Sequence, residues 1–130
     1  MDNLVRHTLP KEERLCSRKA LDELFAGGHR SLSAFPLRAV FMPTEEPGVR
    51  ILVSVPKRHF KRAVKRNRIK RQVREAYRLQ KELLGSIAGG LNIAFLWTSA
   101  DLLPSDRVHQ KMQNLLIRIH EALTHSEPTV

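Results

Sequence analysis

The chain has 130 residues, 42% of them hydrophobic, which is enough for one domain with a core and excludes a wholly disordered chain. The net charge is +10, from 23 Lys and Arg against 13 Asp and Glu, and the single cysteine excludes an intramolecular disulfide. There is no signal-peptide segment, membrane span or zinc-type Cys/His spacing, so we expect a cytoplasmic protein.

The N-terminal half is expected to hold one helix and two strands. Ser17 caps a helix that runs to Phe25 with an apolar face at helical spacing, and glycines follow it. Strands are predicted at 35–43 and 49–55, because apolar residues alternate along both segments. Since only a short turn separates the two strands, we expect them to pair as a hairpin.

The C-terminal half is expected to alternate helix, strand and helix. A long helix is predicted from Arg62 to Leu84, with glycines beyond it, and a largely apolar strand at 91–97. Ser105 caps a last helix that ends near residue 125. The apolar face of that helix is predicted to be buried and consists of Val108, Met112, Leu115, Leu116, Ile119 and Leu123.

The order of these elements is helix, two strands, helix, strand, helix, which predicts an α+β layer protein. We expect a single domain over residues 1–130. Its ends, at 1–12 and 126–130, are expected to be flexible because they are short and polar.

Residues 57–74 hold ten of the 23 basic residues and no acidic residue. The rest of the chain then has 13 bases against 13 acids, so this one segment carries the whole net charge. Because like charges on successive helical turns repel, such a concentration is costly unless a polyanion meets it. The segment therefore predicts a nucleic-acid partner.

The helix within this segment combines an apolar stripe with cationic faces. Ile69, Val73 and Ala76 or Tyr77 recur at helical spacing and are expected to face the sheet. Arginine matches phosphate oxygens with a planar fork, lysine adds a mobile charge, and the amide of Asn67 can contact a base or a sugar hydroxyl. Phosphate would offset the repulsion among the cations on the other faces, which are Arg62, Lys65, Arg66, Arg68, Lys70, Arg71 and Arg74.

No set of residues predicts catalysis by the protein itself. The carboxylate pairs Glu12-Glu13 and Glu45-Glu46 are adjacent in predicted loops and not opposed across a cleft. No glycine-rich phosphate loop precedes a helix, and there is no convincing Ser/His/Asp set. We therefore expect neither catalytic nor metal-binding residues in this chain.

A more specific pattern lies inside the cationic segment. Arg66-Asn67-Arg68, followed by Val73-Arg-Glu-Ala-Tyr77, resembles the signature of the bacterial ribonuclease P protein component. Upstream, Val53-Ser-Val-Pro-Lys-Arg58 is similar to the strand end that leads into that signature, and the segment from Leu21 to Gly27 is similar to the family's first helix. The resemblance covers roughly residues 12–125.

The resemblance implies a small α/β sandwich of about three helices on a three- to four-stranded sheet, with a left-handed β-α-β crossover. It implies a monomer that binds the ribonuclease P RNA with 1:1 stoichiometry and helps it to remove the 5′ leader from precursor tRNA. The RNA would perform the cleavage, using Mg²⁺ that is bound mainly by RNA. We expect no membrane or DNA partner.

The resemblance also assigns site residues by position. Arg66, Asn67 and Arg68 correspond to the family's RNA-contact motif. Further cations that extend this contact are Lys57, Arg58, Arg62, Lys65, Lys70, Arg71 and Arg74. The cleft for the leader is expected at Leu21, Phe25, Phe35, Arg38 and Ser54.

The sequence departs from the family's pattern at three places. Leu21 replaces the first aromatic residue of the family's first helix, and the segment 56–62 is one residue longer than the commonest pattern. Trp97 stands where many members carry an arginine, so it either stacks on a base or belongs to the core.

Two other functions remain as alternatives. The first is a general RNA-binding or ribosome-associated protein without a role in tRNA processing. The second is a DNA-binding helix protein, although the predicted elements include neither a helix-turn-helix pair nor a heptad zipper.

Overall fold

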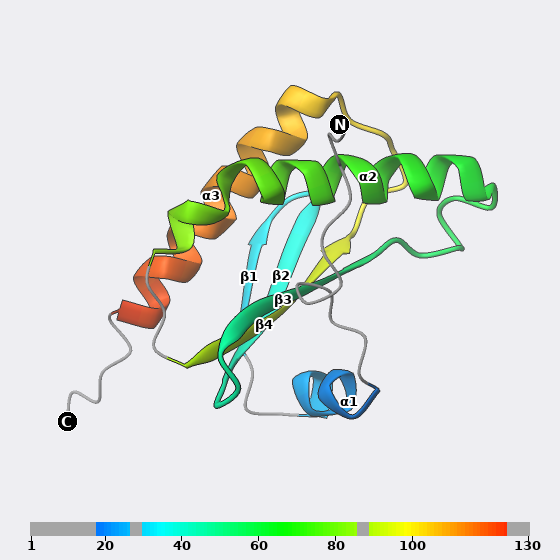
Figure 1. Cartoon of the computed structure of the whole chain (residues 1–130). Helices are drawn as coiled ribbons and strands as arrows, with labels where there is room; N and C mark the ends of the chain where they lie inside the picture. The colour runs from blue at the N-terminus through cyan, green and yellow to red at the C-terminus, as the bar shows by residue number, and fades with distance from the viewer. Residues whose placement is uncertain (1–17, 27–29, 86–88, 125–130) are drawn as a thin grey trace, which may run out of the picture.

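The computed structural model describes residues 18–26, 30–85 and 89–124. Ser17, the predicted helix cap, and the ends predicted to be flexible, 1–12 and 126–130, lie outside these ranges. The described elements, in chain order, are α1 (Arg18–Ala26), β1 (Arg30–Ala34), β2 (Leu37–Thr44), β3 (Gly48–Ser54), α2 (Ala63–Gln80), the 3₁₀ helix η2 (Lys81–Leu84), β4 (Gly90–Trp97) and α3 (Ser105–Thr124) (Figure 1). The predicted α+β class is confirmed. Among the described residues, no helix could span a membrane.

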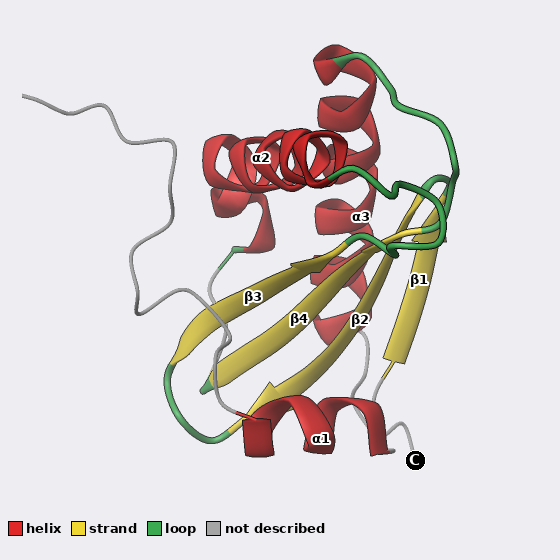
Figure 2. Cartoon of the chain, turned by 90° about the vertical axis from the view of Figure 1, so that its right-hand side faces the viewer, coloured by secondary structure: helices red, strands yellow, loops and turns green. Residues whose placement is uncertain are grey.

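The strands form one mixed sheet in the order β1-β2-β4-β3 (Figure 2). β2 pairs antiparallel with both β1 and β4, whereas β3 pairs with β4 in parallel. The predicted hairpin of 35–43 with 49–55 is therefore wrong, because β4 lies between β2 and β3. β4 is buried along almost its whole length. A strand is covered on both faces in this way only when it lies inside the sheet and not at its edge.

Parallel strands need a crossover connection, and α2 supplies it between β3 and β4. The helix predicted from Arg62 to Leu84 corresponds to α2 followed by η2, which ends at Gly85 with a φ of 71°. The left-handed sense of this crossover stays a prediction.

Strand β1 has no counterpart among the elements predicted from the sequence. It is only five residues long, and Leu32 is its one large apolar side chain, so its alternation is weak. Phe35 begins the strand predicted over 35–43, but it lies in the turn between β1 and β2 and is 67% exposed. The rest of that prediction is confirmed, because Leu37, Ala39 and Phe41 are buried.

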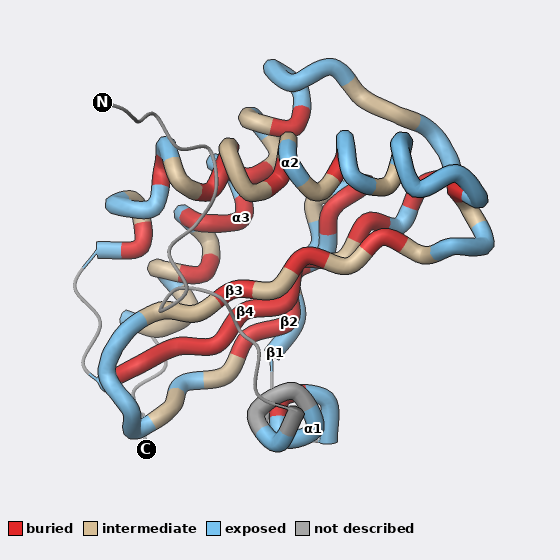
Figure 3. The backbone as a smooth tube through the Cα atoms, turned by 45° about the vertical axis from the view of Figure 1, so that its right-hand side comes forward, coloured by how far each residue is buried: buried red, intermediate tan, exposed pale blue. Residues whose placement is uncertain are grey.

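The two faces of the sheet are covered unequally. α2 and α3 lie on one face and α1 on the other (Figures 1 and 2). The main core lies under α2 and α3, where the rings of Tyr77 and Phe95 are 6.2 Å apart. On the opposite face, α1 packs Leu24 against Val40 and Ala94, and most of its other described residues are exposed (Figure 3).

The apolar faces predicted for the two long helices are confirmed. α2 buries Ile69, Val73, Ala76 and Tyr77. α3 buries all the predicted residues except Leu123, which is partly buried against the main core. These faces fix which sides of α2 remain free for a partner.

Candidate nucleic-acid interface

The cationic surface consists of the loop 57–62 and of α2 as far as Arg74. Since α2 turns Ile69 and Val73 into the main core, the residues between them point away from the sheet. Arg66, Lys70 and Arg74 are half-buried. The exposed members are Lys57, Arg58, Lys61, Arg62, Lys65, Asn67, Arg68 and Arg71. All ten residues predicted to contact RNA therefore lie on this surface.

The N-terminus of α2 adds to the positive potential of the cationic surface. Arg62 is its N-cap and makes no side-chain capping bond, and the first turn contains no acidic residue. The unpaired N–H groups of a helix N-terminus act like about half a positive charge. Among the described residues, no carboxylate pairs with the cations of residues 57–71. The surface is thus left without internal neutralisation by this part of the chain.

Arg66 has a structural role that the sequence did not indicate. Its Nη1 donates to the carbonyl oxygen of Phe60 at 2.6 Å and to that of Lys61 at 3.1 Å. The side chain of Phe60 is buried in the main core, so these bonds join α2 to an anchored point of the preceding loop. Nε and Nη2 of Arg66 have no hydrogen-bond partner within the described ranges and can still donate to a phosphate.

On the other face of the sheet, Arg38 and Ser54 lie in one row. The strand register pairs Arg38 with Leu96 and Leu96 with Ser54, so the three side chains share the face that carries α1. Arg38 is exposed, and its Nε donates to Oγ of Ser31 at 3.0 Å, which orients the guanidinium. Two of the residues predicted for the leader cleft therefore lie on the same face of the sheet, on either side of Leu96.

The aromatic residues predicted for the cleft are accessible. Phe25 in α1 is 49% exposed, and Phe35, in the turn before β2, is 67% exposed. Exposed rings can stack on bases of any sequence. Leu21 belongs to α1, but its side chain lies outside the described part of the structure.

Trp97 belongs to the core. Its side chain is 1% exposed, and its Nε1 donates to the carbonyl oxygen of Asp101 at 3.2 Å. A tryptophan that is buried in this way has no free face for a base. Of the two roles left open for Trp97, burial in the core is the one observed.

The sequence did not point to Ser31 or Leu96 as members of the face that carries α1. The only signal for Ser31 was the short alternation in Arg30-Ser-Leu-Ser-Ala34, and it is visible only once β1 is known to pair with β2. Leu96 lies in an unbroken apolar run, so nothing in the sequence separated its face from that of Trp97.

Within the described ranges, no group of three or more His, Cys, Asp or Glu side chains could hold a metal ion. An ion pair joins Arg50 to Glu46 at 3.3 Å, near the turn before β3 and away from the cationic surface. The chemistry available at the cationic surface is therefore the binding of anions and of hydrogen-bonding groups.

Comparisons with known proteins decide the family. The family model described as ribonuclease P matches residues 9–120. The chain belongs to the ribonuclease P protein family. It is 43% identical to the ribonuclease P protein component of Porphyromonas gingivalis strain W83, over 85% of each chain. It is 35% identical to that of Chlorobaculum tepidum, over 85% of this chain and 81% of the relative.

Solved structures of ribonuclease P proteins share the fold. The protein from Thermotoga maritima matches with a TM-score of 0.68 at 26% identity, over 82% of this chain and 97% of that one. The Staphylococcus aureus protein matches with a TM-score of 0.67 at 17% identity, over 85% and 97%, which is a likeness of fold alone. Membership of the family makes the chain a subunit of an RNA-containing endoribonuclease, so a general ribosome-associated protein is not favoured.

Proposed function

We propose that this chain binds the RNA subunit of ribonuclease P through the cationic surface and holds the 5′ leader of precursor tRNA on the α1 face of the sheet. The observation that carries the proposal is the concentration of the net charge in residues 57–74, on the outward sides of α2 and its loop. Phosphate neutralises such a surface, and arginine forks give fixed geometry to the contact.

The two proposed contacts meet at one end of the molecule. Ser54 ends β3 in the row with Leu96 and Arg38, and the chain then continues directly into Lys57 and Arg58 of the cationic surface. A leader strand that crosses the sheet at this row would therefore pass beside the part of the protein that binds the RNA subunit. Exposed Phe35 at the same end offers a ring on which a leader base can stack.

The chemical step is assigned to the RNA subunit. In the holoenzyme, Mg²⁺ is expected to be held mainly by RNA, since Mg²⁺ sites are typically built from carboxylate and phosphate oxygens and the cationic surface offers neither. The contribution of the protein is to position the RNA and the leader and to neutralise their charge. We also propose that the protein acts as a monomer, 1:1 with the RNA, in the cytoplasm, where its tRNA substrate is made, without a DNA or membrane partner.

The test is reconstitution with a bacterial ribonuclease P RNA and a precursor tRNA at moderate Mg²⁺. We expect the full-length protein to restore leader cleavage and to bind this RNA more tightly than bulk ribosomal RNA. Arg38→Ala should weaken binding of a precursor with a leader and leave binding of mature tRNA unchanged. Equal affinity for ribosomal RNA would instead support a general RNA-binding protein.

A further inference from the structure

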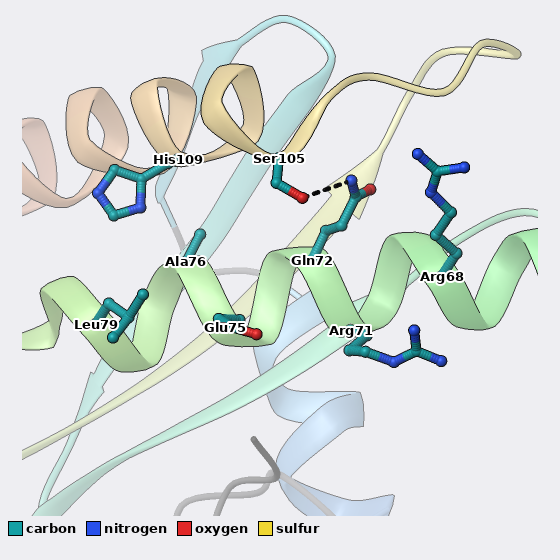
Figure 4. A pocket seen from close by; sticks show the side chains of 8 residues that line it. All are labelled: Arg68, Arg71, Gln72, Glu75, Ala76, Leu79, Ser105 and His109. Atoms are coloured by element: carbon teal, nitrogen blue, oxygen red, sulfur yellow. Dashed lines mark hydrogen bonds between the residues drawn. The ribbon is translucent and has the colours of Figure 1, made fainter. Parts of the chain in front are cut away.

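A pocket of about 350 Å³ opens between α2 and the start of α3, at the edge of the cationic surface. Figure 4 shows Arg68 and Arg71 at one end of it and Leu79 and His109 at the other, with Gln72 between them. Arg68 and Arg71 also belong to the cationic surface, so the pocket is continuous with the proposed RNA contact.

Two glutamines of α2 fix the walls of the pocket. Nε2 of Gln72 donates to the carbonyl oxygen of Leu103 at 3.0 Å and to Oγ of Ser105 at 3.1 Å. Two turns further on, Nε2 of Gln80 donates to the carbonyl oxygen of His109 at 3.0 Å. These bonds hold α2 to α3 and to the segment before it at two places along the helix, so the pocket exists before any ligand arrives.

The amide of Gln72 leaves an acceptor without a donor. Because its Nε2 is committed to the segment before α3 and the first residue of that helix, Oε1 is turned away from them; this atom is buried and has no hydrogen-bond partner within the described ranges. Buried polar atoms are nearly always paired in folded proteins. An N–H group of a ligand in the pocket would supply the missing donor.

The other residues that line the pocket suit a nucleobase better than a bare phosphate. Glu75 also lines the pocket, where its side chain already takes part in an interaction within the chain. Leu79 is 51% exposed and offers an apolar surface, and the ring of His109 offers a stacking partner. Arg68 and Arg71, at the other end, are exposed and suit the phosphates on either side of a nucleotide.

We propose that this pocket binds one unstacked base of the RNA subunit, a base with an amino group that donates to Oε1 of Gln72, while Arg68 and Arg71 bind the adjacent phosphates. The proposal rests on the proposed function, because it takes the RNA subunit as the source of the base. It adds a base contact to a surface otherwise explained by charge alone.

The first test titrates the ¹⁵N-labelled full-length protein with AMP and, separately, with ribose 5-phosphate, and follows the side-chain amide of Gln72 and the ring of His109 by NMR. We expect AMP to shift both groups and ribose 5-phosphate to shift neither. Equal shifts with the two compounds would mean that the pocket binds only phosphate, and no shift with AMP would mean that it binds no base; either result overturns the proposal.

The second test measures the affinity of variants for a bacterial ribonuclease P RNA. Leu79→Ala and His109→Ala should each weaken binding about tenfold, as expected for the loss of a base-stacking contact, with the salt dependence unchanged. Ile117→Ala is the matched control, because Ile117 is also an exposed apolar residue, 39% exposed, and lies on α3 outside the pocket.

Wild-type affinity of both pocket variants would refute the base contact and leave the proposed function standing. If the wild-type protein does not bind this RNA, the proposed function fails, and the AMP titration still decides whether the pocket takes a base.

Discussion

Nη1 of Arg66 lies 2.6 Å from the carbonyl oxygen of Phe60, and this bond joins α2 to the loop that precedes it. The loop carries Lys57, Arg58, Lys61 and Arg62, and Phe60 in its middle is buried. Arg66 therefore does two things at once: it contributes charge to the cationic surface and it fixes the backbone on which four other cations stand.

This relationship predicts that Arg66→Ala lowers both stability and RNA affinity. Removing the guanidinium leaves the carbonyl oxygens of Phe60 and Lys61 without their donor, which we expect to cost about 1–3 kcal/mol of the free energy of unfolding. Urea unfolding of the full-length protein measures this. Arg71→Ala is the control, because Arg71 is exposed: it should weaken RNA binding at unchanged stability. An Arg66→Ala protein as stable as the wild type would show that the bond contributes nothing.

Arg68 is predicted to act on RNA binding without a structural role. It is exposed, so Arg68→Ala should keep the wild-type unfolding curve and lose about 1–3 kcal/mol of binding free energy if a bidentate contact is lost. The logarithm of the affinity for the RNA subunit should fall with the logarithm of salt concentration by about 0.7–0.9 per phosphate neutralised. Arg68→Ala should make that slope shallower by about one contact. Lys19→Ala, which removes an exposed cation from α1, should change neither quantity.

Phe35 is predicted to contact the leader. Since its ring is 67% exposed, Phe35→Ala should leave stability unchanged, while the holoenzyme should bind precursor tRNA less tightly by about 1–3 kcal/mol, the usual value of one base-stacking contact. Affinities for precursor and mature tRNA, measured side by side, isolate the leader. A loss that is equal for both substrates would argue against a leader contact.

Trp97 is predicted to matter for stability alone. Trp97→Phe removes the N–H that donates to Asp101 and leaves space in the core, so we expect a loss of about 1–3 kcal/mol in the free energy of unfolding. Affinity for the RNA subunit and for the leader should be unchanged at a temperature where the variant is folded. Reduced leader affinity at wild-type stability would mean that the indole reaches the substrate after all.

The predicted elements that the structure confirms are those with a strong local period. The apolar stripe of α2, with Ile69 and Val73, and the alternation along β3 each lie within one contiguous segment, so the pattern alone reports the buried face. The short alternation of β1 carried too little signal, and the pairing of β2 with β3 was inferred only from their closeness in the chain.

What the sequence determined by itself was the charge and its position: residues 57–74 hold ten cations and no acid, and most of this segment is a helix whose apolar stripe leaves its cations on the outward sides. Local charge and the spacing of apolar residues depend only on residues that are close in the chain, so they can be read from the sequence alone. The tertiary structure alone decided that β4 separates β2 from β3, that Arg38 and Ser54 share a row, and that Arg66 holds Phe60. Each of these depends on segments that are distant in the chain and that come together to bury apolar surface and to satisfy their hydrogen bonds. No single stretch of sequence shows which of these segments will pair.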